Sequence, residues 1–131
     1  MALIPTLTIT DTTTFSDDIS FSVTDSLTVK APSQSLTNVI AGTAGGDTIL
    51  IAAGSTDTAY LFIRHTGTTD GSTGTAHQLD VENTDNIPFA RMQANEWLFI
   101  PYANTLSSGK GVQLQTTSGS IQVEYAYWTN A

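Results

Sequence analysis

Cysteine is absent from this 131-residue chain, and basic residues are scarce. Without cysteine, neither disulfides nor thiolate metal sites can contribute, so the fold must depend on burial, on β-ladders or on association with other copies. Only 4 Lys and Arg residues stand against 12 Asp and Glu residues, which gives a formal net charge of −8. Nucleic-acid binding draws on clustered Lys and Arg that release counterions, so we expect no nucleic-acid partner.

Long apolar runs are also missing. The chain begins with Met1-Ala2-Leu3-Ile4-Pro5, which has neither a basic start nor a long apolar stretch, and no later segment approaches the roughly 20 apolar residues of a membrane span. We therefore expect a soluble protein with no membrane partner. Charged residues make up only 12% of the chain, while Ser and Thr are plentiful, and this composition favours strands over helices.

The sequence does contain segments in which apolar and polar residues alternate with a period of two. From Ile121 to Thr129, apolar residues alternate with polar or small ones, as in a strand with two different faces. Pro32 cannot donate to a ladder, so we expect a break there between residues 1–35, an extended N-terminal β arm or edge strands, and residues 36–131, the body. The alternative is that the first strands belong to the same sandwich. In the arm, the apolar residues at odd positions are Leu7, Ile9, Ile19, Phe21, Val23, Leu27 and Val29.

Turn residues divide the body into short strands. Gly54 to Asp57 would turn the chain from a strand ending at Ile51 into a strand over 60–65, as a hairpin. The polar stretch 66–75 has no apolar residue to anchor it, so we expect an exposed, mobile loop. About eight strands at this spacing predict an all-β fold, a two-sheet antiparallel sandwich that is jelly-roll-like rather than immunoglobulin-like.

The segment from Trp97 to Tyr102 is the most hydrophobic of the chain. Neighbours along a strand point to opposite faces, so Phe99 and Ile100 must be covered from opposite sides. We expect the sandwich core on one side, and an adjacent segment or subunit on the other.

Three stretches resemble small structural proteins of tailed bacteriophages: Leu27 to Pro32 followed by a β module, Phe89 to Pro101, and the closing Val123 to Trp128. The similarity covers most of the chain and lies with capsid decoration, or cement, proteins that have a jelly-roll body. It implies a non-enzymatic homotrimer in the virion, seated on the major capsid protein or other virion proteins, that stabilises the phage head lattice. Tail, neck, baseplate and fibre components have similar sequence patterns, so the position of the chain in the particle stays open. On this interpretation the candidate interface residues are Leu3, Ile4, Leu7, Ile9, Phe99, Tyr125, Tyr127 and Trp128.

Possible metal ligands are few. His65 and His77 flank the polar stretch and would meet across a hairpin with Asp70 or Asp80, the residue types of a metal site. We favour two half-exposed histidines at strand ends, because no ligand spacing is diagnostic.

A group of carboxylates offers a second metal hypothesis. Asp80, Glu82 and Asp85 lie close together in the sequence, and calcium takes several oxygen ligands. We favour an acidic solvent face, since no calcium-binding loop pattern surrounds them. We expect no metal and no cofactor.

Catalytic motifs are missing as well. A glycosidase would need two carboxylates across a cleft, and none is marked out; serines are abundant, but there is no Gly-x-Ser-x-Gly elbow. We therefore expect no enzyme. A carbohydrate-binding module is the remaining alternative, because aromatic side chains can stack on sugars, although such residues more often fill a core or an interface. The aromatic residues in question are Tyr60, Trp97, Tyr102, Tyr125, Tyr127 and Trp128.

Overall fold

The computed structural model describes residues 2–10, 20–42, 48–54, 58–104 and 108–130, and for 31–40, 58–59 and 130 it describes the backbone alone. These residues form antiparallel strands and no helix, so the all-β prediction is confirmed. The strands are β1 (Ala2–Leu3), β2 (Thr6–Thr10), β3 (Ser20–Thr24), β4 (Leu27–Ala41), β5 (Thr48–Ile51), β6 (Thr58–His65), β7 (Leu79–Asn83), β8 (Pro88–Met92), β9 (Trp97–Ala103), β10 (Val112–Thr116) and β11 (Ile121–Asn130).

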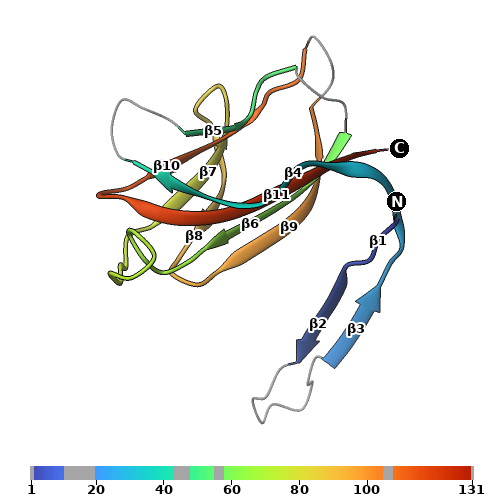
Figure 1. Cartoon of the computed structure of the whole chain (residues 1–131), viewed down its shortest axis with the longest axis horizontal. Coiled ribbons are helices and arrows are strands. Elements are labelled where there is room, and N and C mark those ends of the chain that lie inside the picture. The colour runs from blue at the N-terminus through green and yellow to red at the C-terminus, as the bar shows by residue number, and fades with distance from the viewer. Residues whose placement is uncertain (1, 11–19, 43–47, 55–57, 105–107, 131) are drawn as a thin grey trace.

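Two sheets form the body, and they face each other as a β-sandwich (Figure 1). One sheet has five strands in the order β1-β4-β11-β6-β9, and the other has four in the order β5-β10-β7-β8. Strands β2 and β3 form a separate two-stranded hairpin. The pairs within the body are nested: β4 pairs with β11, β5 with β10, β6 with β9, and β7 with β8.

One local prediction is wrong. The chain between Ile51 and Tyr60 does not close a hairpin, because β5 pairs with β10 while β6 pairs with β9 and β11 in the other sheet. The connection therefore crosses from one sheet to the other. A turn-rich segment between two strands indicates a change of direction, but it does not decide which strands pair.

The core lies between the two sheets and contains aliphatic side chains from both. Along β6 and β11 the inward residues alternate with outward ones, as the period of two requires. The largest fully buried apolar side chains of this core are Ile51, Leu61, Ile63, Leu79, Leu114 and Ile121, with Val81, Val112 and Val123 beside them. This burial supplies the main stabilisation of a chain that has no disulfide.

Strand β4 passes through Pro32 without a break, so the expected boundary near residue 35 shifts towards the N-terminus. Pro32 is opposite Trp128 of β11, and the register shifts on both sides of that pair. Proline is tolerated at such irregularities, where one ladder donor is not required. Val29 is fully buried and pairs with Asn130, so it belongs to the body. Strand β1 is also part of the five-stranded sheet, so only the hairpin of β2 and β3 is separate from the body.

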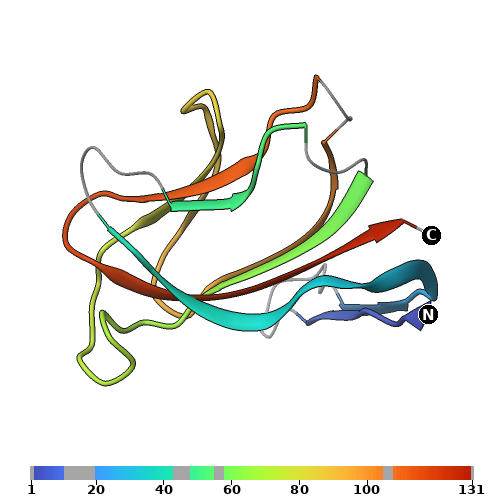
Figure 2. The same cartoon turned by 45° about the horizontal axis from the view of Figure 1, so that its top comes forward.

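The β2–β3 hairpin lies outside the sandwich (Figures 1 and 2). In Figure 2 it lies below the five-stranded sheet, on the side away from the four-stranded sheet. Strand β1 connects it to the body, since Ala2 and Leu3 pair with Thr28 and Leu27 of β4. A further backbone hydrogen bond, from Asp25 N to Pro5 O at 3.2 Å, closes the base of the hairpin.

Candidate interaction surface

The hairpin has one apolar and one polar face. Leu7 is opposite Val23 and Ile9 is opposite Phe21, so these four side chains share a face, which we call the hairpin face. Each is between 38% and 59% exposed. On the other face, hydroxyl groups pair across the strands: Thr6 with Thr24 at 2.9 Å, and Thr8 with Ser22 at 3.1 Å.

A second apolar surface lies on the five-stranded sheet, on the side away from the core. Register places Tyr60 opposite Pro101 and Trp128, and Phe62 opposite Phe99. The rings of Tyr60 and Phe99 stack with centroids 6.2 Å apart and planes 3° apart. Trp97, at the start of β9, is 55% exposed. We call this surface the outer face; its residues are Tyr60, Phe62, Trp97, Phe99, Pro101 and Trp128.

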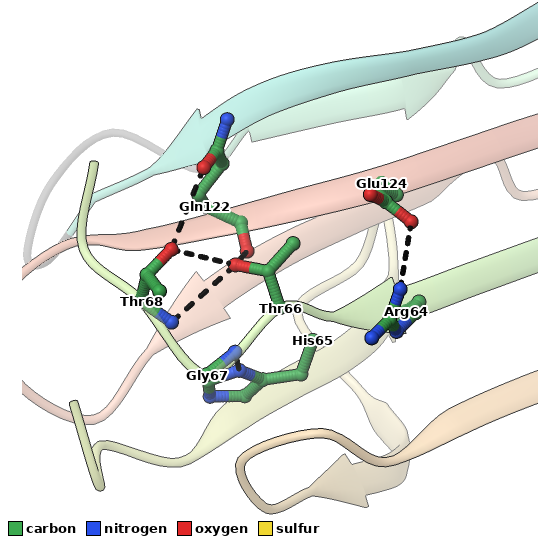
Figure 3. A network of polar contacts seen from close by, with 7 residues as sticks. All are labelled: Arg64, His65, Thr66, Gly67, Thr68, Gln122 and Glu124. Carbon is green, nitrogen blue, oxygen red and sulfur yellow. Dashed lines mark hydrogen bonds and ion pairs between the residues drawn. The ribbon is translucent and has the colours of Figure 1, made fainter. Parts of the chain in front are cut away.

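Charges on the outer face balance. Arg64 lies opposite both Trp97 and Glu124, and its Nη1 is 3.4 Å from the Glu124 carboxylate (Figure 3). The same register places Ala126 opposite Phe62, where it is buried. Since the chain as a whole has a net charge of −8, a neutral surface of this extent is distinctive.

The two apolar surfaces meet along a groove. Its lining comes from the base of the hairpin, with Leu7 and Val23, and from the outer face, with Tyr60 and Phe99. Pro5, Leu27 and Pro101 complete the apolar lining, and Asp25 is its single charged residue. The hairpin face and the outer face are therefore parts of one continuous surface.

The candidate interface residues separate into four groups in the structure. Leu7 and Ile9 lie on the hairpin face, and Phe99 and Trp128 lie on the outer face. Ile4 is 63% exposed just before the hairpin, and Leu3 is half-buried in β1. Tyr125 and Tyr127 point the other way, towards the core, against which they pack half-buried. The sequence did not single out Phe21, Val23, Phe62 and Pro101 as interface residues, although their period-two spacing was visible.

Burial affects the inward tyrosines. It raises the pKa of the Tyr125 hydroxyl, with a smaller contribution from neighbouring Tyr127, and it raises the pKa of Tyr102 as well. The Tyr102 hydroxyl donates to the carbonyl oxygens of Lys110 and Gly111 at 2.9 and 3.1 Å. Of the six aromatic residues considered for sugar stacking, three therefore lie on the inner face and three, Tyr60, Trp97 and Trp128, lie on the outer face.

Polar contacts, rather than apolar ones, anchor the stretch 66–75 (Figure 3). The Thr66 hydroxyl donates to the backbone carbonyl of Gln122 at 2.7 Å, and the backbone N–H of Gln122 donates to the backbone carbonyl of Thr68 at 2.8 Å. Thr68 and Gly74 form a bridge within the loop. The expectation of an unanchored loop is therefore corrected, because threonine hydroxyls and backbone groups can replace apolar anchors.

His65 is fully buried, whereas a half-exposed residue was predicted; His77 is half-buried as predicted. The Gly67 amide donates to His65 Nδ1 at 2.9 Å, so Nε2 bears the ring proton and donates to the carbonyl of His77 at 2.9 Å. Both ring nitrogens are thus used within the fold, and neither is free to bind a metal. The His77 ring contacts the Ser118 hydroxyl at 2.9 Å instead.

Asp70 has a local structural role at the tip of the loop. Its Oδ1 accepts hydrogen bonds from the amides of Thr73 at 2.7 Å and Ser72 at 3.0 Å. These bonds favour the ionised carboxylate and lower the pKa of Asp70 to about 2.

The three neighbouring carboxylates have separate partners. Asp80 forms a bidentate pair with Arg91 at 2.6 and 2.9 Å, and Asp85 lies 3.0 Å from Lys110 Nζ. Glu82 is only 3% exposed and accepts a hydrogen bond from Gln113 at 3.0 Å, so for this residue the prediction of a solvent face is wrong. Within the described ranges, no three His, Asp or Glu residues lie close enough to hold a metal ion.

Catalytic geometry is equally limited. Ser118 and His77 make the one Ser–His contact found in the described part of the chain, and no carboxylate there hydrogen-bonds to either residue. A serine nucleophile needs a base that is itself oriented by a third group. This pair does not meet that requirement.

Comparisons with protein-family models, with curated proteins and with solved structures find no match to this chain. The residues that the structure describes include no helix long and apolar enough to cross a membrane.

Proposed function

We propose that this chain is a non-enzymatic structural protein of a virion, and specifically a homotrimeric capsid decoration protein that stabilises a phage head lattice. The observation that supports this proposal best is the continuous, charge-balanced apolar surface formed by the hairpin face and the outer face. Exposed apolar patches of this kind mark protein–protein contacts in soluble proteins.

The architecture supports the same proposal. The nested pairing of β4 with β11 through to β7 with β8 is the order that a rolled-up long hairpin gives, and this order favours the jelly-roll arrangement that the proposal includes. The five-stranded sheet of this sandwich supports the outer face, which is the surface that the proposal assigns to contacts. The resemblance of the sequence to phage decoration proteins agrees with this arrangement, and the virion position follows from that resemblance.

Binding to capsids tests the proposal. The purified chain would be mixed in increasing amounts with capsids assembled from the major capsid protein that the same genome encodes, and co-sedimentation would be measured. We expect binding that saturates at a fixed molar ratio to the capsid protein, together with a higher temperature of capsid disruption. Failure to co-sediment at any ratio would contradict a decoration role, and saturable binding to purified tails instead would assign the chain to another part of the virion.

A carbohydrate-binding module is the second candidate. The stacked rings of Tyr60 and Phe99 and the exposed indole of Trp97 favour it, since flat aromatic surfaces stack on sugars. The charged side chains nearby, Arg64 and Glu124, are paired with each other rather than directed to a ligand. A glycan array separates the two candidates, because a decoration protein should bind no glycan on it.

A further inference from the structure

We propose that the hairpin face of one copy of this chain packs on the outer face of the next copy. Three such contacts, each between one copy and the next, would close the trimer as a ring. This inference rests on the proposed function, because it names the partner of the surface described above. The inference goes beyond the proposed function because it assigns the contact between copies to two specific surfaces. The partner is a second copy of this chain, bound head to tail.

The apolar face of the hairpin is exposed to solvent in the single chain. A two-stranded hairpin alone is at best marginally stable in water, and β2 and β3 pair only with each other in the described structure. Its four apolar side chains are 38% to 59% exposed. Covering them would remove apolar surface from water, which is the main favourable term in association.

The area is sufficient for a specific contact. At about 200 Å² for a fully exposed large side chain, the hairpin face exposes roughly 370 Å² of apolar surface. The outer face offers a similar area through Trp97, Pro101 and the half-buried rings beside them. With the usual apolar share of interfaces, covering both surfaces corresponds to about 1,200 Å² in total, which is within the range of stable complexes.

Charge favours a second copy at these surfaces. Two copies with a net charge of −8 each repel one another wherever acidic residues meet. The hairpin face has no charged side chain, and on the outer face Arg64 and Glu124 balance each other. Among the described residues of these surfaces, Asp25 in the groove is the one carboxylate without a basic partner opposite it, so copies can approach here with little repulsion between carboxylates.

A chain's own hairpin does not cover its own outer face completely. The groove brings Leu7 and Val23 to the end of that face formed by Tyr60, Phe99 and Pro101. Trp97 lies at the opposite end of β9 and remains 55% exposed. A hairpin from a neighbouring copy is the complementary apolar element that the chain itself supplies. Head-to-tail contacts of this kind close into rings when the rotation allows it.

The first experiment measures the molar mass of hairpin variants. Phe21→Thr with Val23→Thr removes apolar surface while keeping strand-forming residues, and the matched control is Ile49→Thr with Ile87→Thr, which alters exposed apolar residues elsewhere on the body. Light scattering at micromolar concentration should report a trimer for the native chain and for the control, and a folded monomer for the hairpin variant. A hairpin variant that stays trimeric, or a native chain that is monomeric, would overturn the inference.

Cross-linking identifies the two surfaces directly and does not depend on the variant remaining monomeric. The chain has no cysteine, so an Ile9→Cys chain and a Trp97→Cys chain can be co-expressed and treated with a short bis-maleimide. We expect a cross-linked dimer of the two different chains, in several-fold higher yield than from Ile9→Cys with Ile87→Cys. Equal yields in both pairs, or efficient cross-linking of the Ile9→Cys chain to itself, would contradict hairpin-to-sheet packing.

These results are independent of the capsid experiment. If the native chain binds capsids but the hairpin variant stays trimeric, only the inference about the hairpin is contradicted. If the chain forms the expected trimer but binds neither capsids nor tails, only the proposed virion function is contradicted.

Discussion

At the scale of single residues, the direction of a side chain along its strand decides whether it stabilises the fold or remains available to a partner. Ile100 and Phe99 are neighbours in β9, yet Ile100 packs against the core while Phe99 stacks on Tyr60 on the outer face. His65 is a polar residue that belongs to the core, because both its ring nitrogens are hydrogen-bonded.

Substitutions at the two neighbours should therefore separate stability from association. Ile100→Asp places a carboxylate against the core and should lower the free energy of unfolding by at least about 3 kcal/mol, a large part of the roughly 5 to 15 kcal/mol that keeps a domain folded. Phe99→Ala should cost only about 1 kcal/mol, since it removes one aromatic stack, and it should reduce the oligomer mass. Circular dichroism and light scattering check both; a cost above about 3 kcal/mol for Phe99→Ala would show that this ring is part of the core.

Replacing His65 tests the buried hydrogen bonds. His65→Leu keeps an apolar volume but leaves the Gly67 amide and the His77 carbonyl without their partner. We expect the free energy of unfolding to fall by about 2 to 6 kcal/mol, because each of the two unsatisfied groups costs about 1 to 3 kcal/mol. Chemical denaturation measures the change, and His77→Leu, at a half-buried ring, is the control expected to cost less.

Asp70 gives a pH dependence with a defined sign. Its pKa is about 2 in the folded chain against an ordinary 3.8, so its contribution to stability is present above about pH 4 and is lost as the pH falls through about 2. Asp70→Asn should therefore lower the unfolding temperature at pH 6 and have a smaller effect at pH 2. An equal difference at the two pH values would show that the ionised carboxylate does not stabilise the loop.

At the scale of elements, the sequence predicted strands well and their partners poorly. Alternation placed Ile121 to Thr129 in a strand and assigned Phe99 and Ile100 to opposite faces, because the period of two is a local property. The pairing of β4 with β11, and its continuation through Pro32, depends on residues about ninety positions apart, which no local pattern contains. The anchoring of the loop after His65 was missed for the same reason, since its partner Gln122 is distant in the sequence.

Truncation tests where the arm ends. Removing residues 1–26 deletes β1 and the hairpin but keeps Val29 and the whole of β4. We expect a folded body with its sheet signal retained and with weaker self-association. Removing residues 1–30 should instead destabilise the body by about 1.5 to 3 kcal/mol, because it also deletes the buried Val29 side chain. Equal stability of the two truncated chains would move the boundary back towards Pro32.

At the scale of the whole molecule, a two-sheet sandwich presents an apolar surface with few charged residues on an otherwise acidic chain. In the proposed trimer, the acidic remainder would repel other copies except where this surface allows contact, and a closed ring would cover the surface without open-ended growth. A molecule with the proposed function would act by occupying a position in an assembly. Its central property, on this account, is stoichiometric incorporation into a particle.

Quantitative mass spectrometry of purified virions, in which this chain is counted against the major capsid protein, tests that property most directly. We predict that the chain is present in many copies, at a fixed ratio to the capsid protein that does not change on further purification. Its absence from purified virions while it accumulates in infected cells would contradict the account.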